Sequence, residues 1–177
     1  TAYDPNSGEQ LWQVGCMGGE VCSCPCSIDG VIFGANEYAK LVAINGADGK
    51  VLWESSDYLP EVSSPVATKD HLYVATSYGV LAAYDTKTGA LAKEHELNVE
   101  FYSSPMIVEG KLYLFSNDGK MHIFSTDNEF NLLSSFETGF YGWKDRGAYG
   151  KEYLLCSDEL IWHVIIVKIT GSGQKRR

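Results

Sequence analysis

The sequence predicts an all-β protein assembled from repeated four-stranded antiparallel sheets, and three observations support this prediction. The 177 residues include 18 Gly, 11 Tyr and 7 Phe, which is typical of short strands joined by tight turns. A segment of the chain recurs at a regular period of about 40 residues. No repeat contains an amphipathic stretch of about ten residues or more, which excludes a helical solenoid of similar period.

A short serine–proline segment marks each repeat. It occurs as Cys22-Ser23-Cys24-Pro25-Cys26, then as Val62-Ser63-Ser64-Pro65-Val66, and again as Tyr102-Ser103-Ser104-Pro105-Met106. The apolar segments that follow begin in step, at Gly30, Asp70 and Gly110. A fourth copy begins at Gly150, although Asp145 replaces its proline. This unbroken register predicts one structural unit per repeat.

Each unit has room for four short strands, as the second copy illustrates. Strands are expected at 63–68, 71–76, 80–84 and 91–97. In the second of these, Leu72 and Val74 alternate with Tyr73 and Ala75, so both faces are apolar. The turn at 85–89 begins with an Asp that can accept hydrogen bonds from backbone amides and ends with a Gly that tolerates positive φ. Four such strands per repeat predict the blade of a β-propeller.

About four blades are expected in the chain. Residues 1–14 supply the end of one blade, 20–57, 60–97 and 100–138 form full blades, 141–168 a partial blade, and 169–177 a flexible tail. The chain is then half or a fragment of a larger ring, or a small ring closed by pairing of 9–14 with the sheet around Leu160. Unpaired sheet edges promote aggregation, so closure or pairing is expected. We favour a fragment, or a homodimer that completes one ring, over self-closure.

A second motif lies in the last hairpin of each unit. Its fixed positions are Ala2, Asp4, Ser7, Gly8 and Trp12, then Ala43, Asn45, Asp48, Gly49 and Trp53, then Ala83, Asp85, Thr88 and Gly89, with Lys93 in the tryptophan position. This pattern resembles the tryptophan-docking repeat of pyrroloquinoline-quinone-like (quinoprotein dehydrogenase-like) β-propellers. The resemblance implies that Trp12 and Trp53 stack on the neighbouring blade. It assigns a structural role to the turn residues Asp4, Gly8, Gly49, Asp85 and Gly89.

The resemblance does not extend to the cofactor of the family's enzymes. Those enzymes hold the quinone next to two adjacent cysteines, with a calcium ion bound by Glu, Asn and Asp and a further Asp as base. This chain has no adjacent cysteine pair, and none of its positions matches the calcium ligands or the base. We therefore expect no catalytic, cofactor-binding or metal-binding residues.

Three alternating cysteines form the remaining candidate metal site. Cys22, Cys24 and Cys26 would lie roughly 6.5 Å apart along a strand, too far for a shared tetrahedral metal. A bend at Pro25 would bring their sulfurs closer. Packing in the manner of small hydrophobic residues is the favoured interpretation.

The predicted function is that of a non-catalytic scaffold for a protein or peptide partner. The alternative is part of a pyrroloquinoline-quinone-dependent dehydrogenase whose cofactor ligands lie outside this chain. The expected partner surface is a rim near the central channel, comprising Ser23, Ser63, Ser64, Ser103, Ser104, Tyr58, Phe101 and Tyr102. The serines either bind a polar ligand or satisfy backbone groups, and the second role is favoured.

Charge and hydropathy exclude two further classes of partner. The net charge of −9 argues against nucleic acid, which requires a cationic face. No apolar run reaches the roughly 20 residues of a membrane-spanning helix.

Members of the resembled family are often exported, so an extracytoplasmic location is favoured, although closely spaced cysteines argue mildly against it.

Overall fold

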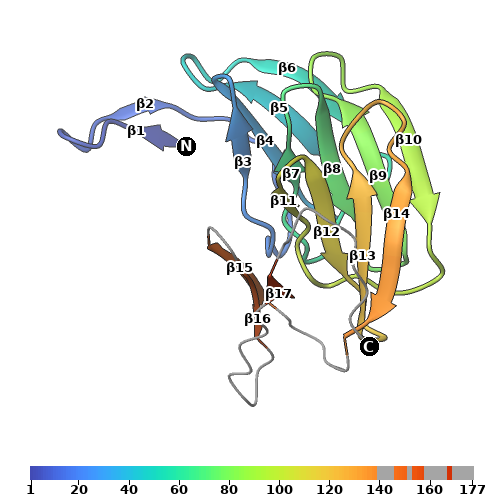
Figure 1. The fold of residues 1–177 in the computed structure, drawn as a ribbon. Coiled ribbons are helices and arrows are strands. Elements are labelled where there is room, and N and C mark those ends of the chain that lie inside the picture. The colour runs from blue at the N-terminus through green and yellow to red at the C-terminus, as the bar shows by residue number, and fades with distance from the viewer. Residues whose placement is uncertain (139–145, 151–152, 158–166, 169–177) are drawn as a thin grey trace.

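The computed structural model describes residues 1–138, 146–150, 153–157 and 167–168, and these residues form strands, turns and loops without a helix. Accordingly, none of the described segments is a helix capable of crossing a membrane. The strands form three complete four-stranded sheets, one two-stranded sheet and one three-stranded sheet. The fold is a partial β-propeller, as the sequence predicted (Figure 1).

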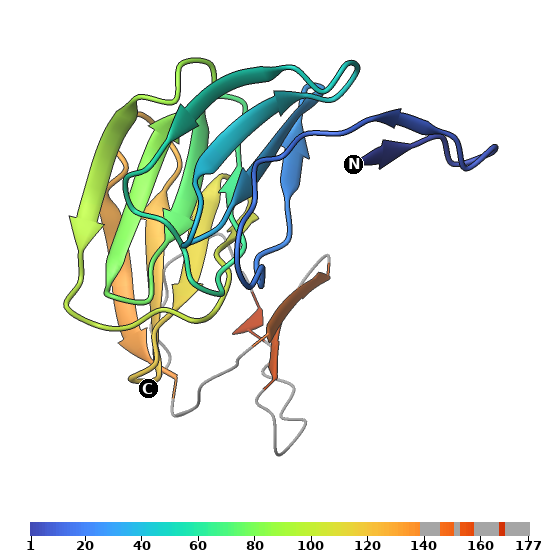
Figure 2. The same cartoon turned by 180° about the vertical axis from the view of Figure 1, so that it is seen from behind.

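The complete blades are antiparallel meanders in which each strand pairs with the next along the chain. The first blade comprises β3 (Cys26–Ile28), β4 (Val31–Ala35), β5 (Leu41–Asn45) and β6 (Val51–Ser55). The second comprises β7 (Val66–Ala67), β8 (His71–Ala75), β9 (Val80–Asp85) and β10 (Leu91–Glu96). The third comprises β11 (Met106–Val108), β12 (Lys111–Phe115), β13 (Lys120–Ser125) and β14 (Leu132–Glu137). The three sheets stand side by side (Figures 1 and 2).

The hydrophobic core lies between neighbouring blades. Because side chains alternate along a strand, β8 presents Leu72 and Val74 to the first blade and Tyr73 and Ala75 to the third. All four side chains are fully buried. The second blade is thus covered on both faces, which fixes the positions of its connecting loops.

The first strand of the second blade is shorter than the sequence predicted. It covers only Val66–Ala67, although a strand was expected from residue 63. Pro65 immediately precedes β7 and has no backbone N–H to donate to a sheet ladder. The segment before it therefore runs outside the sheet and is free to make other contacts.

The chain begins with a separate hairpin arm, formed by β1 (Ala2–Tyr3) and β2 (Gln10–Trp12). It projects from the three blades in both views (Figures 1 and 2). In the described sheets β2 pairs only with β1, whereas Leu160, the expected closure partner, lies outside the described residues. The remaining sheet contains β15 (Arg146–Gly150), β16 (Tyr153–Ser157) and β17 (Val167–Lys168). The tail expected at 169–177 also lies outside the described residues.

Candidate protein-binding surface

Tryptophan and glycine make the contact between successive blades. The Nε1–H of Trp53 donates to the carbonyl of Thr86 at 2.9 Å, and that of Trp12 donates to the carbonyl of Gly46 at 3.0 Å. A Cβ atom on Gly89 would lie 2.5 Å from the ring of Trp53, and one on Gly49 would lie 2.7 Å from the ring of Trp12. Both glycines also have positive φ, so each position requires glycine for two reasons.

Carboxylates hold two of the docking turns, the one that leads to Gly89 and the equivalent one that leads to Gly8. The Oδ1 atom of Asp85 accepts hydrogen bonds from the amides of Lys87 and Thr88 and from the Thr88 hydroxyl. The Thr88 hydroxyl bond contributes most to holding the pKa of Asp85 below its usual value. At Asp4, two backbone amides bind the carboxylate and likewise lower its pKa. These residues stabilise the frame that carries the loops.

The third blade docks differently because Lys93 replaces the tryptophan. There the ring of Phe130 is 2% exposed and lies with its centroid 5.1 Å from Tyr73 and 5.0 Å from His95. The Phe130 carbonyl accepts a hydrogen bond from His95 Nε2, and the Glu129 carbonyl accepts one from Lys93. Phe130 has φ of +45°, a conformation that the sequence does not signal. An aromatic residue from the opposite blade therefore fills the interface.

The rim serines bind backbone groups near the first strands of the blades. The amide of Cys24 donates to Ser64 Oγ, and the amide of Ser64 donates to Ser104 Oγ, both at 2.9 Å. These bonds link successive blades one repeat apart. The hydroxyls of Ser23 and Ser103 donate instead to carbonyls of their own blades, Ala35 and Phe115. Ser63 is 1% exposed, and its hydroxyl has no partner among the described residues.

The aromatic rim residues divide between core and surface. Phe101, expected in an exposed loop, is fully buried and meets His122 edge-on at 6.0 Å. The expectation of exposure was wrong because Phe101 fills the space between the second and third blades. Tyr58 is half-buried, and a hydrogen bond to Glu94 is the main reason that its pKa rises to about 12. Tyr102 is half-buried and lines a cavity.

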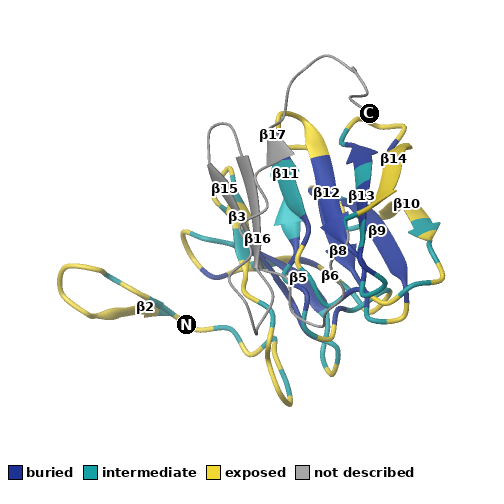
Figure 3. Cartoon of the chain, turned by 60° about the horizontal axis from the view of Figure 1, so that its bottom comes forward, coloured by how far each residue is buried: buried dark blue, intermediate teal, exposed yellow. Residues whose placement is uncertain are grey.

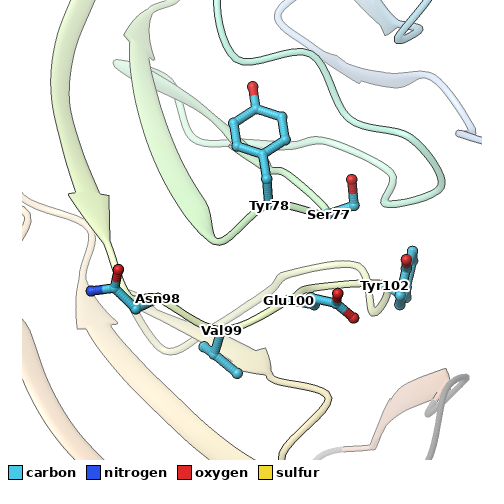
Figure 4. Close-up of a pocket in the computed structure, with 6 residues that line it drawn as sticks. All are labelled: Ser77, Tyr78, Asn98, Val99, Glu100 and Tyr102. Carbon is cyan, nitrogen blue, oxygen red and sulfur yellow. The ribbon is translucent and has the colours of Figure 1, made fainter.

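That cavity has a volume of about 430 Å³ and lies between two loops (Figure 4). The β8–β9 turn contributes Ser77 and Tyr78, and the β10–β11 connection contributes Asn98, Val99, Glu100 and Tyr102. Tyr78, which is 58% exposed, was not anticipated from the sequence. Its counterpart one repeat earlier, Tyr38, is 71% exposed, and this recurrence was the available signal.

The electrostatic environment of this end of the blades is acidic. Burial raises the pKa of Tyr102 above its usual value, and so do the carboxylates of Glu100, Glu61 and Glu37. Burial also raises the pKa of Tyr78, with contributions from Glu37 and Asp57. These acids come from the β4–β5 turn, the β6–β7 connection and the β10–β11 connection. Loops from several blades thus contribute to one negative surface. Figure 3 shows that buried residues lie mainly in the strands and that many connecting loops are exposed or half-buried.

Cys22, Cys24 and Cys26 do not form a metal-binding cluster in the described part of the chain. Cys22 and Cys24 precede β3 and are exposed, whereas Cys26 is half-buried within it. Burial raises the pKa of the Cys26 thiol to about 11, which disfavours the thiolate that a metal needs. Among the described residues, no three His, Cys, Asp or Glu side chains lie close enough to hold a metal ion.

Comparison with known proteins identifies the family. The family model described as outer membrane protein assembly factor BamB matches residues 1–58 and 59–129. The chain belongs to the BamB family. A BamB of Shewanella oneidensis is 31% identical over 101 residues, which is 50% of this chain and 26% of that protein.

Solved structures share the fold at low identity. The BamB of Moraxella catarrhalis matches 88% of this chain and 49% of its own length, with a TM-score of 0.68 and 19% identity. A quinohemoprotein alcohol dehydrogenase from Pseudomonas putida matches 66% of this chain and 20% of its own, with a TM-score of 0.58 and 19% identity. The chain therefore spans about half, or less, of the relatives that it matches.

Proposed function

We propose that this chain is a non-catalytic scaffold that binds a protein partner through the acidic, tyrosine-bearing loops at one end of its blades. The observation that carries the proposal is the cavity between the β8–β9 turn and the β10–β11 connection, with Tyr78 exposed beside it. Aromatic side chains on loops held by a rigid sheet are common anchors of protein interfaces. The relatives are named as assembly factors for outer membrane proteins, which supports a role in binding other proteins.

A quinone-dependent dehydrogenase is the weaker candidate. Its support is the fold shared with the Pseudomonas enzyme, and such likeness concerns the fold alone. The described residues do not fit the cofactor, because they contain neither an adjacent cysteine pair nor a group of acids able to hold calcium. We expect that addition of the quinone with calcium produces neither dye-linked alcohol oxidation nor a change in visible absorbance.

The proposed location is extracytoplasmic. The relatives are named for the assembly of outer membrane proteins, which agrees with the location favoured from the sequence. Fusion of the chain to a reporter that is active only outside the cytoplasm tests this in the cells that make the protein.

Site-specific photo-crosslinking tests the binding role. A photoreactive residue at position 78 is expected to give a discrete protein adduct in the cells that make this protein. The same residue at position 109, in the exposed turn at the opposite end of β11, serves as the control. Equal adducts at both positions, or none at either, would contradict the proposed surface.

A further inference from the structure

The cavity beside Tyr78 has a fixed shape. The amide of Leu97 donates to the Gly79 carbonyl at 2.9 Å, and the amide of Asn117 donates to the Glu100 carbonyl at 3.0 Å. A Cβ atom on Gly79 would lie 2.8 Å from the Val99 carbonyl, so the two loops approach as closely as glycine permits. The cavity is therefore present before any partner binds, which lowers the entropic cost of binding.

The lining of the cavity combines aromatic, aliphatic and acidic groups. Tyr78 comes from one loop, and Val99, Glu100 and Tyr102 from the other (Figure 4). The face of a tyrosine ring attracts cations, and a carboxylate does so more strongly. Its volume of about 430 Å³ is near the lower end of the range of about 300–1,000 Å³ for ligand pockets. The cavity is large enough for one long side chain.

The acidic side chains around the cavity favour a positively charged ligand. Glu37 acts on both tyrosines, Glu61 and Glu100 act on Tyr102, and Asp57 acts on Tyr78. Lys40 immediately precedes β5 and Lys120 begins β13 at this end, but they pair with Glu54 at 2.7 Å and with Asp118 at 2.5 Å. The third ion pair in the described part of the chain joins Lys93 and Glu129. Glu37, Glu61 and Glu100 therefore take part in none of the three ion pairs. One oxygen of Glu37 is also buried without a hydrogen-bond partner among the described residues.

The geometry points to an arginine side chain of the partner protein as the group that occupies this cavity. A guanidinium is planar, stacks on aromatic rings and donates two parallel hydrogen bonds to one carboxylate, whereas the ammonium of lysine is more strongly hydrated. The Glu100 side chain lies toward Tyr102 (Figure 4), so an arginine there contacts a ring and a carboxylate at once. This inference rests on the proposed scaffold function and names the chemistry of its partner.

Fluorescence anisotropy with three labelled probes tests the inference. The probes are glycine–serine nonapeptides that carry two arginines, two lysines or two citrullines, the last being neutral and nearly the same shape as arginine. The arginine probe is expected to bind at least fivefold more tightly than the lysine probe, because only the guanidinium stacks and bonds at once, and the citrulline probe is expected not to bind. Equal binding of the arginine and lysine probes would overturn the assignment.

Matched variants locate the binding. Glu100→Gln and Tyr78→Leu are each expected to lower the affinity for the arginine probe by a factor of about 3 to 30, since each removes one favourable contact with the cation. Glu109→Gln makes the same charge change at the opposite end of β11 and is expected to have no effect. Equal losses for Glu100→Gln and Glu109→Gln would show general attraction to an acidic protein and overturn the site.

The crosslinking and probe-binding experiments distinguish failure of the arginine assignment from failure of the proposed function. If a crosslink forms from position 78 while the arginine probe does not bind, the surface binds a partner of different chemistry. If neither occurs, the scaffold role at this surface fails as well. Thermal unfolding of each variant verifies that it is folded, and Tyr78, at 58% exposure, contributes little to the core.

Discussion

At the scale of single residues, docking depends on large aromatic side chains rather than on charge. We predict that Trp53→Ala lowers the free energy of unfolding by about 3–5 kcal/mol, because it opens a cavity at a ring that is 9% exposed and removes a hydrogen bond. Leu52→Ala, one residue away at 46% exposure, is the control and should cost about 0.5 kcal/mol or less. Urea denaturation measures both, and equal losses would contradict the docking role.

The same comparison applies to the interface that lacks tryptophan. Phe130→Ala is expected to cost about 3–5 kcal/mol, whereas Lys93→Ala should cost about 1 kcal/mol or less. Phe130 is buried against Tyr73, while the ion pair of Lys93 with Glu129 is exposed and 3.8 Å long. If urea denaturation shows a larger loss in the free energy of unfolding for Lys93→Ala than for Phe130→Ala, the assignment of a stabilising role to Phe130 is wrong.

Cysteine reactivity provides a prediction about local environment. A thiol with a pKa of about 11 rather than 9.0 is ionised roughly a hundredfold less at pH 8, and only the thiolate reacts. We therefore expect iodoacetamide to modify exposed Cys22 and Cys24 long before Cys26. Peptide mass spectrometry over a time course measures the order, and denatured protein, in which all cysteines should react alike, is the control.

At the scale of strands and turns, the sequence anticipated the period, the last three strands of the second blade and the alternation in β8, because these follow from local chemistry. It did not anticipate that Phe101 is buried or that Phe130 replaces a tryptophan. Both depend on the space between blades that the side chains of the neighbouring blade do not fill. The sequence of a single repeat contains no information about that space. The cavity was missed for a similar reason, since its two loops lie on either side of β9 and β10 and meet only in the folded sheet.

A buried histidine links the last two strands of the third blade to a turn. His122 is 5% exposed, and its ring nitrogens lie 2.9 Å from Ser116 Oγ and 3.1 Å from Ser135 Oγ. Burial lowers its pKa below 6.5; Lys120 adds to this shift and Asp118 opposes it. The unfolded chain then binds a proton more readily than the folded one. Stability is therefore complete above pH 6.5 and falls as the pH decreases from there toward the pKa of the folded state.

Urea denaturation at pH 7.5 and 5.5 measures this effect. The free energy of unfolding should fall between the two, and the fall should be smaller in His122→Gln, which retains a hydrogen-bonding side chain that does not titrate. The lowered pKa values of Asp85 and Asp127 act below about pH 4 and lie outside this window. An unchanged fall in His122→Gln would assign the pH dependence to other groups.

At the scale of the whole molecule, the hairpin arm raises the question of how the ring is completed. The arm contains two strands of a blade, and one edge of β1 is unpaired in the described sheets. Tyr3 and Leu11 on the arm are each 59% exposed. A free edge beside exposed apolar side chains binds further strands readily. The arm is therefore where another segment, from a second copy or from a longer chain, is expected to complete a blade.

We predict that the 177-residue chain forms a dimer in which each copy completes the open blade of the other. It matches 49% of the length of the Moraxella BamB, so two copies supply about the amount of chain in one such protein. Light scattering on a sizing column should give about twice the monomer mass of 19.5 kDa. Leu11→Asp places a charge on the arm and should shift the mass to that of the monomer. Leu52→Asp, at the corresponding position of β6, should leave the dimer intact. A monomeric wild-type chain with a protease-sensitive arm would instead indicate that the missing strands come from a longer form of the same chain.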